Sequence, residues 1–205
     1  ITAKNVAQKF RFRVASSSAE DVLTNSSINT VFVATPHNSH ASLASHALLN
    51  GKNVFVEKPL SITREGLREV TQARAKSSAL LMVGFNRRFS PVAAEIKKAV
   101  AGRLYPSIMN FRVNAGSIAR DHWIQKPAVG GGRILGEMCH FIDLMQYFVG
   151  AYPVSVFATS IHGPAQNEKE VEADTLSVIV KFSNGSVGTL TYVANGDPSL
   201  PKEYL

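Results

Sequence analysis

Polar and charged side chains follow short apolar runs in the first part of the chain, at the points where those runs end. The runs are Val31–Ala34, Asn53–Val56 and Leu80–Phe85, and the residues after them are Thr35, Pro36, Asn38, His40, Glu57, Lys58, Pro59 and Arg87. Apolar runs that alternate with helix-length segments are typical of buried parallel strands, whose carboxyl ends collect ligands. The sequence therefore predicts a small-molecule site at the ends of these strands.

Lys58 is the first candidate for proton transfer. It follows a predicted strand and precedes Pro59, which stiffens the turn. A lysine amine held in this way donates a proton or holds a substrate hydroxyl when burial lowers its pKa. The alternative is a lysine that extends from the strand end into water, and the spacing alone leaves both open.

His140 is the second candidate, on a helix predicted from Ile134 to Val149. Glu137 lies one turn before it and Asp143 one turn after it. A carboxylate near a histidine raises its basicity and fixes its tautomer, so this spacing suits an acid–base unit. The alternative is a histidine at the edge of the core with both acids in water.

Other polar motifs carry weaker signals. His37 and His40 have a spacing found in zinc sites, but a metal site needs three or four convergent ligands, and we predict none. Asn38 or Ser39 suits the N-cap of the following helix. The glycines Gly130-Gly131-Gly132 lack the strand that precedes a phosphate-binding loop, so they predict a close approach of the backbone to a cleft where the two predicted parts of the chain meet. Trp123, just upstream, is a candidate wall of the same cleft.

The predicted helices and strands that position these residues indicate that the chain has two structural parts. Residues 1–89 predict a partial Rossmann-like α/β domain with a parallel sheet. Residues 90–205 predict an α+β domain with a mostly antiparallel open sheet, since 108–114 alternate and Asn184-Gly185 is typical of a hairpin turn. A further short strand is predicted at Arg11–Val14. Thr63 and Ser90-Pro91 are predicted helix starts.

Composition and charge argue against several classes of protein. The chain has 205 residues, 45% of them hydrophobic, and a formal charge of +7. Its lysines and arginines are dispersed, which argues against nucleic-acid binding. No apolar run is long enough to span a membrane, and the first residues lack a signal-peptide pattern. With a single cysteine, Cys139, we expect a cytoplasmic protein without disulfides.

Four ordered motifs together resemble one known family. They are Ala34-Thr35-Pro36-His37-Asn38 with His40, Glu57-Lys58-Pro59, Gly84–Phe89, and Gly130-Gly131-Gly132 followed by Cys139–Asp143. This order resembles the Gfo/Idh/MocA family of NAD(P)-dependent oxidoreductases. The resemblance implies hydride transfer at a carbinol carbon of a sugar, cyclitol or related polyol, with NAD or NADP as cofactor, and homo-oligomers formed through the C-terminal sheet.

The resemblance also implies roles for particular residues. Lys58 and His140, with Glu137, would be catalytic, and Trp123 and Asp143 would join Lys58 and His140 in holding substrate. The cofactor would contact Thr35, Pro36, Asn38, His40, Glu57, Lys58, Pro59 and Arg87.

The sequence departs from the family pattern in two ways. Gly136 occupies the usual position of an aspartate, and Glu137 is displaced from it by one residue, about 100° on a helix. The family's first strand and glycine-rich loop would precede residue 1, and the sequence leaves the choice between NAD and NADP open. The rival hypothesis is a non-catalytic binding or assembly module that has lost the dyad.

Overall fold

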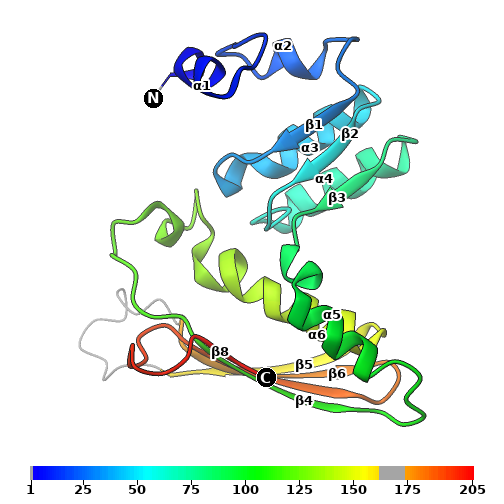
Figure 1. Cartoon of the computed structure of the whole chain (residues 1–205), viewed down its shortest axis with the longest axis vertical. Helices are drawn as coiled ribbons and strands as arrows, with labels where there is room; N and C mark the ends of the chain where they lie inside the picture. The colour runs from blue at the N-terminus through cyan, green and yellow to red at the C-terminus, as the bar shows by residue number, and fades with distance from the viewer. Residues whose placement is uncertain (1, 162–173) are drawn as a thin grey trace. The chain divides into compact units, whose positions relative to one another are not determined.

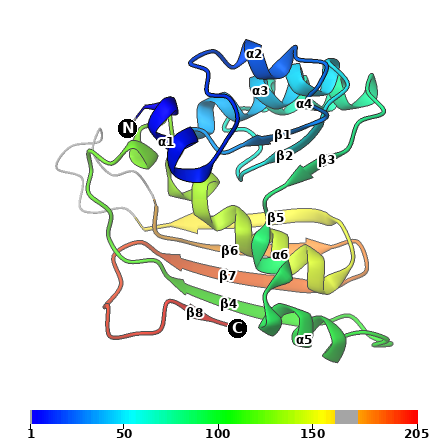
Figure 2. The ribbon, with the colours of Figure 1, turned by 45° about the horizontal axis from the view of Figure 1, so that its top comes forward.

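The computed structural model describes residues 2–161 and 174–205. The chain divides into two compact units, Ile1–Gly84 and Phe85–Leu205, which are drawn together in Figures 1 and 2 and described separately below. The short helix η2 (Asn86–Phe89) belongs to the second unit, although the sequence predicts residues 1–89 as the first part.

The first unit is built on a parallel sheet of three described strands in the order β1-β2-β3. These are β1 (Thr30–Val33), β2 (Asn53–Val56) and β3 (Leu81–Val83). The register aligns Val33 with Val56 and Val56 with Val83, so the three carboxyl ends lie side by side. The parallel sheet expected from the apolar runs is confirmed.

One face of this sheet forms the core of the unit. The helices α3 (His40–Leu49) and α4 (Arg64–Ala75) contribute Ala44, Leu48 and Val70 to a cluster with the alternate strand residues. On the opposite face Phe32 remains 73% exposed within the described residues, against its neighbour Phe55. The apolar runs are thus buried through every second side chain, not through all of them.

The start of α4 follows its sequence signal, whereas Ser39, at the N-cap of α3, makes no side-chain capping bond. Thr63 accepts a hydrogen bond from the Gly66 amide at the start of α4, as predicted.

The strand expected at Arg11–Val14 is wrong. Arg11 takes a left-handed conformation at the end of α1 (Ala3–Phe10), and the exposed residues after it pair with no described strand. The short helix α2 (Glu20–Leu23) follows.

The second unit contains a sheet in the order β5-β6-β7-β4-β8. Its strands are β4 (Ile108–Asn114), β5 (Pro153–Ser160), β6 (Leu176–Phe182), β7 (Val187–Val193) and β8 (Glu203–Tyr204). Only the central β4–β7 pair is parallel among the described pairings, so the mostly antiparallel sheet is confirmed. Gly185, with φ of 85°, closes the predicted hairpin between β6 and β7.

Helices cover one face of this sheet. They are α5 (Pro91–Ala99), which begins at the N-cap Ser90 as predicted, and α6 (Cys139–Val149), which crosses the strands in Figure 2. Phe141 and Met145 of α6 pack against Leu190 and Tyr192 of β7, all at most 1% exposed. The predicted helix from Ile134 is divided, because Ile134–Met138 form a π-helical turn, η4, before α6 begins.

Within the described residues, no helix is both long and apolar enough to cross a membrane.

Candidate active site

In the first unit, the turns after β1 and β2 lie next to each other. The Glu57 amide donates to the Val33 carbonyl oxygen at 2.8 Å, which continues the strand pairing into the turns. Thr35, Pro36 and Asn38 are exposed there, and Lys58 is half-buried. The Lys58–Pro59 peptide bond is cis, which the sequence could not establish. Parallel pairing therefore gathers the predicted residues of this unit at one rim.

The 3-10 helix η1 (His37–Ser39) fixes the direction of the Thr35 hydroxyl. The Ser39 hydroxyl donates its single hydrogen to the Pro36 carbonyl oxygen at 2.8 Å. Thr35 Oγ1 lies 2.6 Å from Ser39 Oγ, so Thr35 must be the donor in that bond. The exposed Thr35 oxygen consequently offers only lone pairs to a ligand, which makes it an acceptor for an amide or hydroxyl.

Glu57 packs against the end of β3. A Cβ atom placed on Gly84 would lie 3.2 Å from the Glu57 carboxyl carbon and 3.2 Å from the Phe55 ring. Gly84 therefore provides the space that this carboxylate occupies beside the rim.

In the second unit, His140 is buried, with 7% of its surface exposed, at the start of α6. The Phe85 ring meets it edge-on, with 6.1 Å between ring centroids. The histidine is therefore held at the edge of the core by an aromatic contact from the segment that precedes η2.

Glu137 is held by a cluster of ionic and hydrogen-bonding groups. Its carboxylate accepts from Arg133 at 3.1 Å and Tyr192 at 2.5 Å, and Lys202 lies 2.8 Å away. Burial by itself raises the pKa of Glu137, but these three hydrogen bonds outweigh it and lower the pKa to about 2. Burial and the Glu137 charge raise the pKa of Tyr192 in turn. Glu137 is thus a fixed anion at neutral pH.

Sequence reasoning missed the partners of Glu137. Arg133 has only 1% of its side chain exposed and also donates to the carbonyl oxygens of Gly116 and Ala194. The four-residue spacing of Arg133 and Glu137 was the available signal, since such pairs share a helix face. Tyr192 and Lys202 come from β7 and the residue before β8, and no local pattern connects them to Glu137.

Asp143 and Arg87 are both engaged in pairs within the second unit. Arg88 donates hydrogen bonds from Nε and Nη2 to the two oxygens of the Asp143 carboxylate. This hydrogen bonding raises the pKa of Arg88. Arg87 donates to Glu203 at 2.5 Å and lies over the Phe141 ring, 4.8 Å from its centroid. These contacts attach η2 to α6 and β8.

Trp123 begins the short helix η3 (Trp123–Gln125) and is 39% exposed. The close approach that the structure shows at the glycines is to the Ile124 backbone beside Trp123, and the predicted approach to a cleft stays a prediction. A Cβ atom on Gly130 would lie 2.3 Å from the Ile124 Cα atom, which only glycine avoids. Gly131 and Gly132 take φ angles of 74° and 78° in the same turn. The glycines therefore serve to pack η3 against the segment before η4.

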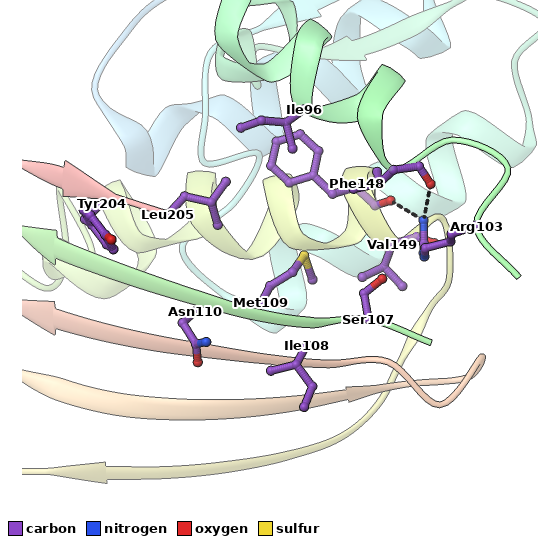
Figure 3. A pocket seen from close by; sticks show the side chains of 11 residues that line it. Ile96, Arg103, Ser107, Ile108, Met109, Asn110, Phe148, Val149, Tyr204 and Leu205 are labelled. Carbon is purple, nitrogen blue, oxygen red and sulfur yellow. Dashed lines mark hydrogen bonds between the residues drawn. The ribbon is translucent and has the colours of Figure 1, made fainter. Parts of the chain in front are cut away.

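A separate hollow of about 450 Å³ lies in the second unit between α5, the end of α6 and β4 (Figure 3). Its lining is mainly apolar, and the Arg103 guanidinium donates to the carbonyl oxygens of Val100, Phe148 and Val149. A polyol site needs several convergent polar groups, which this hollow does not offer. None of the predicted site residues lines it.

No group of three or more histidine, cysteine, aspartate or glutamate side chains suited to a metal ion occurs among residues 2–161 and 174–205.

Comparison with known proteins matches both parts of the chain to family models. Residues 2–85 match the oxidoreductase family with an NAD-binding Rossmann fold, and residues 92–199 match the GFO/IDH/MocA C-terminal domain.

Among curated proteins, levoglucosan dehydrogenase of Pseudarthrobacter phenanthrenivorans is 26% identical over 222 residues, covering 94% of this chain and 56% of that protein. The scyllo-inositol 2-dehydrogenase (NAD(+)) of Bacillus subtilis is 28% identical over 193 residues, covering 91% of this chain and 54% of that protein. The chain thus spans about half the length of the curated relatives it matches.

A solved structure of levoglucosan dehydrogenase with NADH and levoglucosan matches with a TM-score of 0.82 and 27% identity, covering 96% of this chain and 56% of that one. The matched models, the two-part architecture and the rim after β1 and β2 lead to one conclusion: the chain belongs to the GFO/IDH/MocA family of oxidoreductases.

Proposed function

We propose that the protein is a NAD(P)-dependent dehydrogenase that transfers a hydride to or from a carbinol carbon of a sugar, cyclitol or similar polyol. The observation that carries the proposal is the rim after β1 and β2, where Thr35, Asn38 and Lys58 lie on adjacent turns. Relatives that share the fold are named as dehydrogenases of levoglucosan and inositol, which favours an enzyme over a non-catalytic module.

The rim fits the nicotinamide end of such a cofactor. A carboxamide or a ribose hydroxyl needs hydrogen-bond acceptors, and the Thr35 oxygen is oriented as one. Asn38 offers both a donor and an acceptor, and Pro36 adds an apolar surface. We propose that these residues, with Glu57, Lys58 and Pro59, hold the cofactor, which supplies the hydride acceptor or donor when bound.

Oxidation of an alcohol also releases a proton, and we propose Lys58 and His140 as the candidates to move it. Trp123 and Asp143 are proposed substrate contacts, and Arg87 a proposed cofactor contact. Arg87 pairs with Glu203 and Asp143 pairs with Arg88, which would hold both side chains in place for these contacts. Glu137, held ionised by three partners, supports His140 as a fixed anion one turn away and does not exchange protons near neutral pH.

The test is turnover by the whole protein with NAD⁺ or NADP⁺ and a panel of cyclitols, anhydrosugars and linear polyols, followed through NADH or NADPH absorbance. Lys58→Met and His140→Asn should each lower kcat/KM by a factor of about 100 or more. The matched controls are Lys76→Met and His122→Asn, at exposed positions. Full activity in both site variants would remove these residues from the mechanism.

We further propose a homo-oligomer formed through the face of the second sheet that α5 and α6 leave open. Phe157 lies beside Ile179 across that face, and the two side chains are 66% and 45% exposed. These exposed apolar side chains support contact with another chain, here a second copy. Analytical ultracentrifugation of the unsubstituted protein should show an oligomer, and Ile179→Lys should dissociate it. The control Lys181→Glu, at a neighbouring position, should weaken the oligomer less. If the unsubstituted protein sediments as a monomer, the proposal is wrong.

A cytoplasmic location is the remaining proposal, supported by the single cysteine, which suits a reducing compartment. Fractionation of the source cells tests it, and recovery outside the cytoplasm would exclude it.

A further inference from the structure

The central strands of the second sheet, β4 and β7, run parallel and end side by side (Figure 2). Their register aligns Asn114 with Val193, and the Ala115 amide donates to the Val193 carbonyl oxygen at 2.8 Å. The carboxyl ends of neighbouring parallel strands are where α/β sheets collect ligands. The second unit therefore has an edge of its own that suits a ligand, just beyond residues 114 and 193.

The segment of residues 194–202 is fastened to the end of β4. The Asn114 side chain is buried, and its Nδ2 atom donates to the Asp197 carbonyl oxygen at 2.6 Å. A Cβ atom on Gly196 would lie 2.0 Å from Asn114 Oδ1, so a side chain there would displace the Asn114 amide group. The Asn114 backbone amide donates to the Lys202 carbonyl oxygen at 2.7 Å. The backbone of Lys202 is therefore held beside the end of β4.

Lys202 directs its ammonium toward Glu137, whose charge a buried cation already balances. Lys202 Nζ lies 2.8 Å from Glu137 Oε1, and the Arg133 guanidinium donates to Glu137 Oε2 at 3.1 Å. The Arg133 side chain is 1% exposed, whereas the Lys202 side chain is 52% exposed. Two cations share one carboxylate, so the cluster has one surplus positive charge, and its exposed member is Lys202.

The Lys202 ammonium can bind a second anion. A lysine ammonium has three N–H donors, and Glu137 is the one carboxylate that ion pairs among residues 2–161 and 174–205 give to it. A ligand carboxylate, with a charge of −1, matches the single surplus charge, whereas a phosphate group carries about −1.5 to −2. Hydrogen bonds between ionised groups are also roughly twice as strong as those between neutral groups. A carboxylate therefore fits this ammonium better than a neutral hydroxyl or a phosphate does.

We infer that Lys202 is a substrate-binding residue that holds a carboxylate, and that the substrates are sugar acids such as uronates. Through Glu137, the ammonium is attached to the turn that leads into α6 and His140, the proposed proton-transfer group of this unit. The inference rests on the proposed function and narrows its substrates from polyols in general to polyols that carry a carboxylate.

The first experiment compares turnover of paired substrates by the whole protein with NAD⁺ or NADP⁺. The pairs are glucuronate with glucose, galacturonate with galactose, and gluconate with glucitol, in which a carboxylate replaces a hydroxymethyl group. In the pair that is turned over fastest, kcat/KM should be about tenfold or more higher for the acid. Equal or higher values for the neutral members would overturn the inference and leave the proposed dehydrogenase function standing.

Variants of Lys202 then test its part in that preference. Lys202→Gln should lower the ratio of the acid and neutral kcat/KM values about tenfold or more, through KM for the acid. Lys202→Arg, which keeps the charge, should retain the preference. The matched control is Lys98→Gln, at a lysine that pairs with Glu95 and is 73% exposed, and it should leave the ratio unchanged. A general loss of activity cancels in this ratio, so an unchanged ratio in Lys202→Gln would contradict the inference.

The second experiment does not depend on a nicotinamide. Glucuronate, inorganic phosphate and glucose are titrated at equal ionic strength into the 205-residue chain, and the NMR signals of the Asp197, Ser199 and Lys202 amides are followed. Glucuronate should shift these signals saturably, and phosphate and glucose should shift them less. No shift, a larger shift with phosphate, or a shift that persists in Lys202→Gln would overturn the inference. If the protein proves not to be a dehydrogenase, this titration still decides whether Lys202 binds a carboxylate.

Discussion

Arg88 and Asp143 form a two-pronged ion pair between η2 and α6, with Nε 2.6 Å from one carboxylate oxygen and Nη2 bonded to the other. The Asp143 side chain is only 9% exposed, and the Arg88 guanidinium is the cation that faces it. The pair sits one helical turn beyond His140 and holds the segment whose Phe85 ring touches that histidine.

Replacing one partner of this pair is expected to destabilise the second unit. Asp143→Asn should lower the free energy of unfolding by about 1–3 kcal/mol, less than the loss of a fully buried pair. The reduction arises because the Arg88 side chain is 34% exposed. Urea unfolding measures the change.

The control for this prediction is Glu95→Gln, which breaks the exposed pair with Lys98. That variant should lose less than about 0.5 kcal/mol, as exposed pairs on one helix do. Equal losses in the two variants would contradict the prediction.

Glu137 should make stability depend on pH in the acid range. Its pKa falls from 4.5 to about 2 on folding, so the unfolded chain binds the proton more tightly. Its contribution is complete above pH 4.5 and disappears as the pH falls through 2. Glu137→Gln should therefore cost on the order of 2–3 kcal/mol at neutral pH and far less near pH 2. Urea unfolding at several pH values tests this, and a loss independent of pH would exclude an ionic role.

The Tyr192 hydroxyl should contribute through its bond to the Glu137 carboxylate. Tyr192→Phe removes only that oxygen from a side chain with no exposed surface. We expect a loss of about 1.5–3 kcal/mol in the free energy of unfolding, because the acceptor is charged.

Tyr152→Phe is the matched control, at a position that is 74% exposed. It should change the free energy of unfolding by less than about 0.5 kcal/mol, as most surface substitutions do. In the Glu137→Gln background the effect of Tyr192→Phe should shrink, and full additivity would show that the two groups do not interact.

Gly130 should tolerate no side chain. Gly130→Ala places a methyl group against the Ile124 backbone, which cannot move aside as a flexible side chain can. We therefore expect a loss of about 2–3 kcal/mol in the free energy of unfolding.

The control is Gly102→Asn, at a glycine whose left-handed φ is 72° and where nothing lies within 4 Å of an added Cβ atom. Asparagine adopts this conformation more readily than most residues. Thermal unfolding of both variants measures the contrast, and a stable Gly130→Ala protein would contradict the close approach.

Most of the fold could be predicted because its signals are local. The run Val31–Val33 and its neighbour Asn53–Val56 carry the strand pattern in their own residues, and Thr63 and Asn184-Gly185 specify a helix start and a hairpin by their own chemistry. The strand predicted at Arg11–Val14 had an alternating pattern of its own but no partner strand among the described residues, and pairing rather than pattern makes a strand.

The site was less predictable because its details depend on distant residues. The motif placed His40 beside the cofactor, but its buried contacts with Thr35 and Pro59 exist only once β1 and β2 are paired. The π-helical turn at Ile134–Met138 likewise contains Glu137, whose partners Tyr192 and Lys202 lie far away along the chain. No pattern within one helix encodes such contacts.

The parallel pairing of β4 with β7 affects how the second unit is made. Ser107 and Ser186, which bond at the start of this pairing, are 79 residues apart in the chain. A ribosome adds about 5–20 residues per second, so roughly 4–16 s pass between the synthesis of β4 and the synthesis of its partner β7. During that time the apolar side chains of Phe111 and Val113 on β4 cannot be buried in the completed sheet. We therefore expect a nascent chain that ends before Val187 to bind chaperones, and one that extends past Val193 to be released from them.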